Sequence, residues 1–384
     1  MKNICIIGAG RQGTACAYDL VRFLDNINLV FLDIDINQSK QASNRINELL
    51  GYKAKYESFD IFDKEKLIDF LDSFDLFLSS VPYHFNIYLT DIAIESKTSM
   101  VDLGGHTLNV KKQLSRTQDA IDAGITIVPD CGMGPGMNVS VALMGIESMD
   151  TPKEVYVWDG GLPLNPIAPW NYSLFFNING LTNEYDGSAY FIEDRKVKEF
   201  DCFELIENLE FENIGKLEAA VTSGGLSTMP WTYEGKLNVL QNKTLRYPGH
   251  WEQMIAYRQL GLFDEQKINF NGQELSPRDF YHYLLAPKLE QDDNRDICLM
   301  RVDTIGSNNG KPAKNRIELS EKYDEETKFL AMEKWTGWHA SIVMIEILDG
   351  NIAKGAIPIE KALPGSIFHD KAIERSYKIK ITNR

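Results

Sequence analysis

The sequence predicts an α/β protein in two parts: a doubly wound parallel sheet, followed by a second domain of α+β type with a mixed sheet. Short apolar runs alternate with amphipathic helical segments through the first 130 residues, and a Gly-rich turn joins the first run to the first helix. Beyond about residue 150, turn residues multiply, and polar and apolar residues alternate. Strand–helix alternation is typical of parallel βαβ units, and polar–apolar alternation is typical of half-exposed strands.

The first part should contain six strands. We expect them at residues 4–7, 29–32, 53–59, 76–81, 99–103 and 125–129. The helices between them are expected at residues 11–24, 39–50, 64–74, 85–96 and 110–123. Nearly continuous apolar strands indicate burial on both faces of the sheet. The usual strand order, 3-2-1-4-5-6, opens a ligand crevice at the carboxyl ends of the first and fourth strands.

The second part has fewer clear helices. We expect strands at residues 154–158 and 190–197, and helices at residues 137–146, 251–260, 277–285 and 341–349. The stretch 358–378 could return to the first domain. We therefore assign residues 1–130, with a tail of about 340–384, to the first domain, and residues 131–339 to the second.

Composition excludes several classes of protein. Forty Lys and Arg residues stand against 55 Asp and Glu, which gives a net charge of −15. A chain this acidic is a poor candidate for binding nucleic acid or anionic membranes, so we expect a small-molecule partner. No apolar stretch reaches the roughly 18–20 residues of a membrane helix, and the N-terminus lacks the pattern of a signal peptide.

The five cysteines are scattered without a CxxC pair. This spacing indicates neither a disulfide framework nor a zinc site, and free thiols favour a reducing cytoplasm. We therefore expect a cytoplasmic protein without a metal.

The Gly-rich turn matches G-x-G-x-x-G between a strand and a helix, the context of a Rossmann dinucleotide site. Its members are Gly8, Ala9, Gly10, Arg11, Gln12 and Gly13. Gly8 allows the tight turn, Gly10 lets the backbone approach a pyrophosphate, and Gly13 lets the helix pack close to the strand. The pyrophosphate would lie on the free N–H groups of the helix N-terminus.

The cofactor is predicted to be NAD. Asp33 stands 20 residues beyond Gly13, at the end of the second strand, where a carboxylate accepts hydrogen bonds from the ribose and repels a 2′-phosphate. Lys40 is the nearest downstream cation. Asp60, after the third strand, could reach the adenine, although a helix cap explains it equally well.

Three segments at the ends of the fourth, fifth and sixth strands should surround the nicotinamide half. Their residues are Ser80, Val81, Pro82, Gly104, Gly105, Asp130, Cys131 and Gly132. A second cluster joins Arg246, Tyr247 and His250. Arg presents a planar fork that matches a carboxylate, and His titrates near neutrality.

These motifs together resemble the saccharopine dehydrogenase family, and within it most resemble L-lysine 6-dehydrogenases. The matching segments are residues 8–13 (GAGRQG), 101–105 (VDLGG), 129–132 (PDCG), 222–228 (TSGGLST), 245–250 (LRYPGH) and 336–337 (TG), with the tail 355–362. Two segments depart from the family pattern. Residues 334–337 read KWTG where the family has Arg-Thr-Thr-Gly, and His106 stands where it has Asn.

The resemblance implies a Rossmann domain completed by the C-terminal tail, and an inserted catalytic domain whose sheet forms a homodimer. It also implies substrate-pocket roles for the residues that match the family's site: Asp130, Cys131, Gly132, Thr228, Arg246 and His250. The expected reaction is NAD-dependent oxidation of the ε-amino group of L-lysine to the 6-semialdehyde.

We expect His250 first, and Asp130 second, to carry the proton. Arg246 would hold the α-carboxylate, and Cys131 would shape the pocket without a covalent role. Two alternatives stay open: a saccharopine-type secondary amine as substrate, and a non-catalytic NAD-binding regulator.

Overall fold

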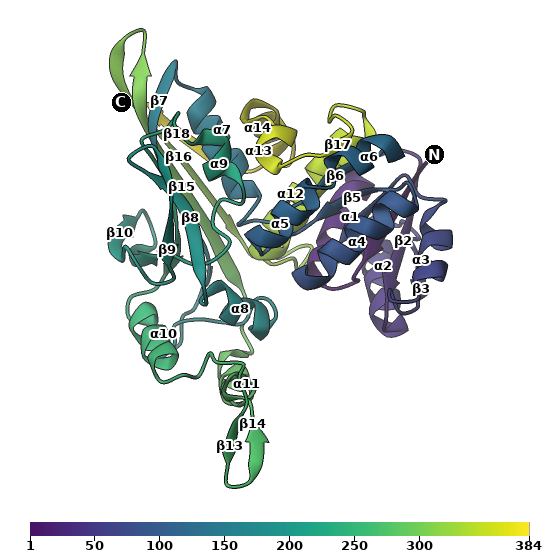
Figure 1. Cartoon of the computed structure of the whole chain (residues 1–384), viewed down its shortest axis with the longest axis horizontal. Helices are drawn as coiled ribbons and strands as arrows, with labels where there is room; N and C mark the ends of the chain where they lie inside the picture. The colour runs from purple at the N-terminus through teal and green to yellow at the C-terminus, as the bar shows by residue number, and fades with distance from the viewer. Residues whose placement is uncertain (384) are drawn as a thin grey trace.

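The computed structural model, which describes residues 1–383, contains a seven-stranded parallel sheet and a nine-stranded mixed sheet (Figure 1). The parallel sheet has the order β17-β6-β5-β4-β1-β2-β3, so the predicted order 3-2-1-4-5-6 is confirmed. Its strands are β1 (Lys2–Ile7), β2 (Ile27–Asp33), β3 (Lys55–Ser58), β4 (Leu76–Ser79), β5 (Ser99–Asp102), β6 (Thr126–Val128) and β17 (Gly355–Ala356). The seventh strand comes from the C-terminal region and pairs with β6.

Helices cover both faces of this sheet. They are α1 (Arg11–Phe23), α2 (Ile36–Leu50), α3 (Lys64–Leu71), α4 (Asn86–Glu95), α5 (Thr107–Leu114) and α6 (Thr117–Ala123), with a 3₁₀ turn at Tyr83–Phe85. Along β1, Ile4 and Ile6 pack in one buried cluster, and Cys5 and Ile7 pack in another. This alternation follows from the period of two in a strand with both faces buried.

The expected helix 110–123 is wrong, because two helices, α5 and α6, occupy this region. The break falls at Ser115 and Arg116. The N–H of Arg116 donates to the carbonyl of Gln113 (3.0 Å), a tight i→i−3 hydrogen bond that ends α5. Such bonds commonly close the last turn of a helix.

The mixed sheet has the order β10-β11-β12-β7-β15-β16-β18, with β8 and β9 attached beside β12. Its strands are β7 (Thr151–Pro163), β8 (Ser188–Glu193), β9 (Lys196–Asp201), β10 (Glu207–Phe211), β11 (Gly215–Ala220), β12 (Val239–Arg246), β15 (Asp296–Asn308), β16 (Lys311–Lys322) and β18 (Ile379–Asn383). β12 and β7 run parallel, and the other pairs are antiparallel. The prediction of an α/β fold with a second, mixed-sheet domain is confirmed.

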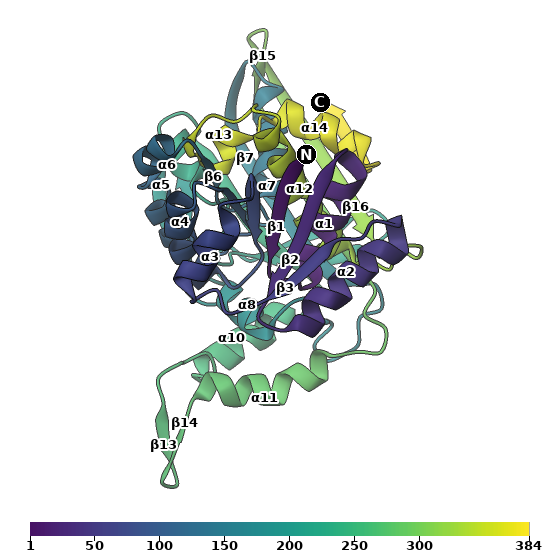
Figure 2. The ribbon, with the colours of Figure 1, turned by 90° about the vertical axis from the view of Figure 1, so that its right-hand side faces the viewer.

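The remaining elements surround the mixed sheet or extend from it. The helices are α7 (Met137–Glu147), α8 (Ile178–Glu184), α9 (Met229–Tyr233), α10 (His250–Gln259), α11 (Pro277–Leu289), α13 (Ile359–Ala362) and α14 (Gly365–Glu374). A two-stranded hairpin of β13 (Ile268–Phe270) and β14 (Gln273–Leu275) projects beyond α11, away from the parallel sheet (Figure 2).

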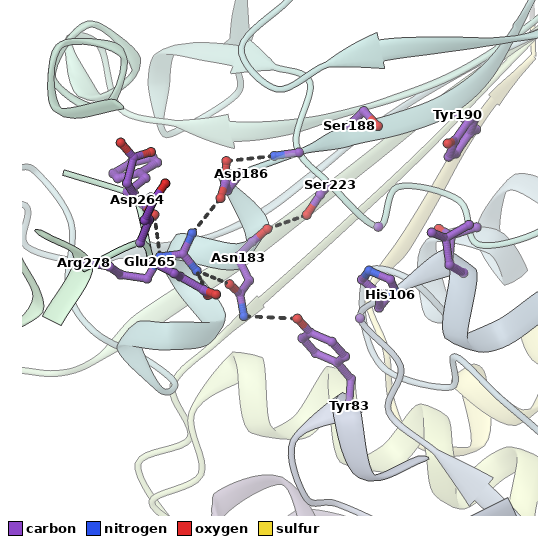
Figure 3. Close-up of a pocket in the computed structure, with 17 residues that line it drawn as sticks. Tyr83, His106, Asn183, Asp186, Ser188, Tyr190, Ser223, Asp264, Glu265 and Arg278 are labelled. Atoms are coloured by element: carbon purple, nitrogen blue, oxygen red, sulfur yellow. Dashed lines mark hydrogen bonds and ion pairs between the residues drawn. The ribbon is translucent and has the colours of Figure 1, made fainter. Parts of the chain in front are cut away.

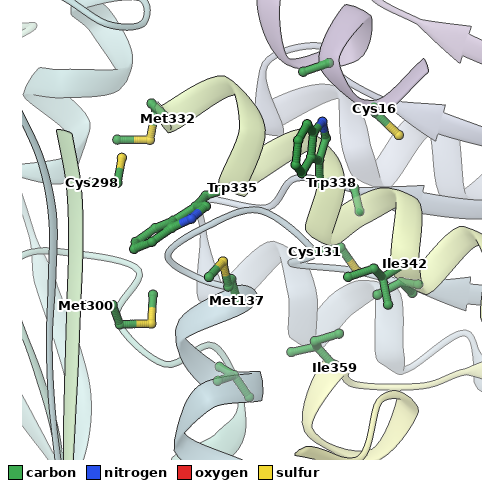
Figure 4. Packing of buried hydrophobic residues seen from close by; sticks show 14 of the residues in the cluster. Cys16, Cys131, Met137, Cys298, Met300, Met332, Trp335, Trp338, Ile342 and Ile359 are labelled. Carbon is green, nitrogen blue, oxygen red and sulfur yellow. The ribbon is translucent and has the colours of Figure 1, made fainter. Parts of the chain in front are cut away.

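The long helix α12 (Ala331–Leu348) joins the two domains. It is buried almost all round, and Trp335, Trp338 and Ile342 pack between the Met and Cys side chains of both domains (Figure 4). A Cβ on Gly337 would lie 2.6 Å from the backbone N of Cys16, so glycine permits the close crossing of α12 and α1. The chain then continues to β17 of the parallel sheet, and its last strand, β18, pairs with β16 of the mixed sheet. The tail therefore contributes to both sheets.

Candidate functional site

The Gly-rich turn leaves open space at only one of its three motif glycines. Gly8 has φ +95°, and a Cβ there would lie 2.6 Å from the carbonyl oxygen of Ser80. A Cβ on Gly13 would overlap the carbonyl oxygen of Gly8, whereas one on Gly10 would meet nothing within 4 Å. Gly10 immediately precedes α1, whose first N–H groups have no intrahelical partners. This cradle therefore fits a pyrophosphate group.

Asp33 stands at the edge of the cradle. Its Oδ2 accepts a hydrogen bond from the N–H of Ala9 (2.8 Å), and its Oδ1 accepts one from the N–H of Asp35 (3.0 Å). Asp33 pairs with Ser58 across β2 and β3, so the exposed Asp60 follows the neighbouring strand end. Asp60 does not cap α3: its Oδ1 accepts from Phe62 (2.9 Å), and Asp63 is the cap.

Two adjoining cavities lie where the carboxyl ends of the parallel strands meet the second domain. The smaller cavity measures about 310 Å³ and the larger about 660 Å³. They share Tyr83, Gly105, Asn183, Ser223 and Gly224. The Tyr83 hydroxyl accepts a hydrogen bond from Asn183 Nδ2 (3.4 Å), which links the two domains at this boundary (Figure 3).

The smaller cavity brings together part of the predicted site. The predicted residues that line it are Gln12, Val81, Pro82, Gly104, Gly105, Gly132 and Arg246. Several others lie behind its wall or elsewhere: Ser80, Asp130, Cys131, Thr228, Tyr247 and His250. The cavity thus joins the edge of the dinucleotide domain to β12 of the mixed sheet.

Arg246, the last residue of β12, is buried, and each of its three guanidinium nitrogens has a partner inside the protein. Its Nη2 lies 3.0 Å from Glu184 Oε1, its Nε donates to the hydroxyl of Tyr185 (2.7 Å), and its Nη1 donates to the carbonyl of Leu245 (2.9 Å). Burial raises the pKa of Glu184, and the neighbouring guanidinium opposes this shift. The charge of Arg246 is therefore compensated within the chain.

His250 contacts the site only through Tyr185. Its Nε2 lies 2.9 Å from the Tyr185 hydroxyl, and its Nδ1 lies 3.3 Å from the carbonyl of Trp170. Because a carbonyl only accepts, Nδ1 carries the proton and Nε2 accepts from Tyr185. Burial, with help from Arg246, lowers the pKa of His250 to about 3. A neutral His250 in this place orients Tyr185 and Arg246 and does not reach the cavity.

Asp130 lies beneath Gly104 and Gly105 in the wall of the smaller cavity, and Cys131 follows it in the chain. Asp130 Oδ1 accepts from the N–H of Gly105 (3.3 Å), and burial, followed by the nearby Asp102, raises the pKa of Asp130 to about 7. Cys131 Sγ lies 3.4 Å from the carbonyl of Val128, and burial raises the pKa of this thiol well above its usual range. Cys131 is therefore an uncharged core thiol that lines neither cavity, and the absence of a covalent role stays a prediction.

Thr228 and Tyr247 line neither cavity, and their hydroxyl groups form hydrogen bonds within the protein. Thr228 donates to the buried Glu360 (3.0 Å), and the Tyr247 hydroxyl donates to the carbonyl of Pro163 (3.0 Å). Tyr247 packs against a separate apolar cluster of the mixed sheet that includes Trp158.

Sequence reasoning missed Asp159, Glu184 and Asn242, which all line the smaller cavity. Asp159 Oδ1 accepts from Asn242 Nδ2 (2.7 Å), and burial raises the pKa of Asp159 to about 7. The expected strand 154–158 ended one residue short of it. A charged residue between a strand and Gly160–Gly161 was the available signal, but its partner Asn242 depends on the pairing of β7 with β12. Within residues 1–383, no group of three His, Cys, Asp or Glu side chains could hold a metal ion. No helix in this range is long and apolar enough to cross a membrane.

Comparisons with known proteins agree with this architecture. Residues 4–128 match the saccharopine dehydrogenase NADP binding domain, and residues 132–374 match the saccharopine dehydrogenase C-terminal domain. The mitochondrial alpha-aminoadipic semialdehyde synthase of Mus musculus is 26% identical over 303 residues, which cover 72% of this chain and 30% of that protein. The saccharopine dehydrogenase [NADP(+), L-glutamate-forming] of Pyricularia oryzae is 24% identical over 289 residues, or 73% of this chain and 60% of its own length.

Among solved structures, the apo saccharopine dehydrogenase (L-Glu forming) of Saccharomyces cerevisiae superposes with a TM-score of 0.81 at 17% identity, over 100% of both chains. At this identity the likeness establishes the fold. The two family matches together span both domains, and the chain belongs to the saccharopine dehydrogenase family.

Proposed function

We propose that the chain is an NAD-dependent oxidoreductase that oxidises the carbon bearing the ε-amino group of L-lysine and yields the 6-semialdehyde. The observation that carries this proposal is the smaller cavity, where the edge of a dinucleotide site meets a wall that holds the Arg246–Glu184 ion pair and the buried carboxyl group of Asp159. Family membership supports an oxidoreductase that acts on a C–N bond, and the named relatives act in the chemistry of saccharopine and aminoadipic semialdehyde.

The cofactor would lie along the carboxyl edge of the parallel sheet. The N–H groups at the start of α1 and the open space above Gly10 would hold the pyrophosphate, and Asp33 would accept from the ribose hydroxyls. Val81, Pro82 and Gly104 would border the nicotinamide. When bound, the dinucleotide supplies the hydride acceptor.

Asp33 also supports NAD over NADP, because a 2′-phosphate beside this carboxylate would be repelled. Asp35 and Asp60 stand near the same strand ends and add to that repulsion. The family's domain description names NADP, so the cofactor preference is a point on which this chain is proposed to differ.

The charge of the cavities supports the smaller substrate. Among the described residues, Arg246 is the only Lys or Arg that lines the smaller cavity, and Glu184 neutralises it. Arg278 is the only one that lines the larger cavity, and Asp186 (2.6 Å) and Glu265 (2.7 Å) neutralise it. Saccharopine carries three carboxylates, and each would need a cation or several hydrogen-bond donors. Lysine carries one carboxylate and an overall positive charge.

The reaction requires a neutral amine. The ε-ammonium of lysine has a pKa near 10.4, and lowering it to about 7 corresponds to roughly 4–5 kcal/mol at about 1.36 kcal/mol per unit. A carboxyl group in the cavity wall lowers the barrier to this step, because a carboxylate can take the proton as the ammonium loses it.

The saccharopine reaction is retained as the second candidate, because several relatives carry that name. A non-catalytic regulator is disfavoured, because a regulator has no need of a cavity with buried charged groups beside the nicotinamide site.

The test is NADH absorbance with purified protein, NAD and either L-lysine or saccharopine at mildly alkaline pH. Turnover with lysine and release of ammonia supports the proposal. Turnover with saccharopine alone would support the second candidate, the saccharopine reaction. If neither substrate gives NADH, while the protein still binds NADH, both candidate functions are contradicted. Arg246→Ala should raise KM and leave NADH binding intact. Its matched control is Arg301→Ala, which removes a buried arginine paired with Glu318 in the same sheet, outside both cavities.

A further inference from the structure

Asp159 presents a buried carboxyl group to the smaller cavity. It lies on β7 and is 4% exposed, opposite Thr244 of β12 and Met300 of β15. Its Oδ1 accepts from Asn242 Nδ2 (2.7 Å). Its Oδ2 lies only 2.6 Å from where a Cβ of Gly134 would stand, so the glycine leaves this oxygen uncovered on that side.

This carboxyl group differs from the other one in the cavity wall. Glu184 has a guanidinium partner in Arg246. Asp159 is held only by the neutral amides of Asn242 and Asn138, and within residues 1–383 it forms no ion pair. A buried carboxylate without a cation is costly. An ammonium group of the substrate in the cavity would be its natural counter-ion.

We propose that Asp159 accepts the proton that the substrate's ammonium group loses before hydride leaves the neighbouring carbon. This inference rests on the proposed amine oxidation. One N–H bond of the ammonium breaks, its electron pair stays on nitrogen, and an O–H bond forms on the Asp159 carboxylate. The nitrogen lone pair then forms the C=N bond as the C–H pair leaves to an oxidised nicotinamide, which is reduced. Water adds to the iminium carbon, its protons pass from oxygen to nitrogen, and the C–N bond breaks to release the aldehyde and ammonium.

The surroundings of Asp159 suit this role. Burial raises its pKa to about 7, and the nearby Glu184 adds to the rise, whereas Arg246 and the two amides oppose it. The remaining titratable neighbour is Cys298 on β15, whose thiol is held uncharged because burial raises its pKa well above its usual range. A base with a pKa near the working pH is ionised often enough to accept a proton and strong enough to hold it.

The two residues first expected to carry the proton are less well placed. His250 uses both ring nitrogens, on Tyr185 and on the carbonyl of Trp170, and does not line either cavity. Asp130 lies under Gly104 and Gly105 and does not line either cavity. Asp159 is the carboxyl group in the smaller cavity wall that combines access with the lack of a cation.

The test compares wild type with Asp159→Asn, using Asp69→Asn, an exposed position on α3, as the matched control. In wild type, kcat/KM for L-lysine should rise with pH through a step near 7. Asp159→Asn should lose that step and at least about 100-fold in kcat/KM, the contribution typical of a general base. NADH affinity and Tm should stay near wild type. Asp69→Asn should behave as wild type.

A second readout does not depend on turnover. Calorimetry of L-lysine binding to the NADH complex, in two buffers of different ionisation enthalpy, measures proton exchange on binding. Wild type should show an exchange near pH 7 that Asp159→Asn lacks. If Asp159→Asn does not fold, Asn242→Ala takes its place: loss of the amide donor should raise the pKa of Asp159 and move the step to higher pH.

The outcomes separate the two proposals. Suppose that wild type oxidises lysine or another amine, that the kcat/KM of Asp159→Asn still rises with pH near 7, and that this kcat/KM is less than about threefold below wild type. Asp159 is then not the proton acceptor, and the proposed function stands. If kcat/KM of Asn242→Ala rises at the same pH as in wild type, Asp159 is likewise not the proton acceptor. If wild type binds NADH but oxidises no amine, the proposed function fails and the role of Asp159 fails with it.

Discussion

A pair of alanine substitutions in the Gly-rich turn separates cofactor binding from folding. At Gly10, φ is −74° and ψ is −169°, a conformation open to any L residue, and a Cβ would meet no atom within 4 Å. Gly10→Ala should therefore change the free energy of unfolding by no more than about 0.5 kcal/mol. In the complex, the same methyl group would occupy the path of the pyrophosphate. Loss of one or two hydrogen bonds to a charged group, worth about 1.5–3 kcal/mol, corresponds to a roughly 10–100-fold weaker affinity.

Gly13→Ala should behave in the opposite way. Its Cβ would overlap the carbonyl oxygen of Gly8 and lie 2.8 Å from Ile6 Cγ2, so α1 must move away from β1. Overpacking of this kind costs about 1–3 kcal/mol, and Tm falls by about 2–4 °C for each kcal/mol in a domain of 150–250 residues.

The assay is thermal unfolding without ligand, followed by titration with NADH at a temperature where both variants are folded. Wild-type NADH affinity in Gly10→Ala would refute the placement of the pyrophosphate over Gly10. An unchanged Tm in Gly13→Ala would refute the inference that α1 is pressed against β1 at this point.

Three further predictions concern the cofactor, the tail and the cavity. Asp33→Ala should weaken NAD and relax discrimination against NADP, as measured by the ratio of kcat/KM values; an unmoved ratio would exclude Asp33 as the ribose ligand. Arg375→Ala should remove the buried ion pair with Asp19 (2.7 Å) and lower stability by about 3–5 kcal/mol. Burial raises the pKa of Asp19 in the folded state, and Arg375 opposes this rise, so the pKa of Asp19 should rise further in Arg375→Ala. The loss of stability should therefore be smallest at acidic pH, where Asp19 is protonated in both folded proteins. It should grow as pH rises through the raised folded-state pKa of Asp19, and urea unfolding at several pH values checks this sign. Glu184→Gln should leave Arg246 uncompensated and favour substrates with more carboxylates, so the ratio of KM for lysine to KM for saccharopine should rise; a fall in that ratio would contradict the charge argument.

The strands and helices of the parallel sheet were readable from the sequence because each βαβ unit is local: apolar runs, helical stripes and a Gly-rich turn lie close together along the chain. The strand order was taken as the usual order of this fold, because no local pattern encodes the pairing of β1 with the distant β4. The split of α5 and α6 was missed because one i→i−3 bond at Arg116 ended the first helix. The return of the tail to both sheets depends on the distant pairings of β17 with β6 and β18 with β16, which no local pattern encodes.

The same distinction between local patterns and distant pairings applies to the candidate site. Gly10 and Asp33 could be proposed as cofactor-binding residues from the sequence because their spacing is set within one βαβ unit. In the second domain, Arg246 was found from its residue type, but the orientation of His250 was not. Both ring nitrogens of His250 form hydrogen bonds inside the protein, to the hydroxyl of Tyr185 and to the carbonyl of Trp170, which is distant in sequence. Asp159 was missed because its significance comes from Asn242 on a neighbouring strand.

The charge of the two cavities also bears on how a substrate arrives. Their walls carry five carboxyl groups, Asp159, Glu184, Asp186, Asp264 and Glu265, against two guanidinium groups, Arg246 and Arg278. Each guanidinium is paired inside the protein, so the excess of three carboxyl groups faces the entering molecule. A concave site lined by one sign of charge concentrates ligands of the opposite sign. Lysine enters with a net charge of about +1 and saccharopine with about −1, as their ionisable groups require near neutral pH. If the proposed function holds, the same walls would attract lysine and oppose saccharopine. The carboxyl group of Asp159, which has no ion-pair partner, would then both attract an ammonium group and accept its proton.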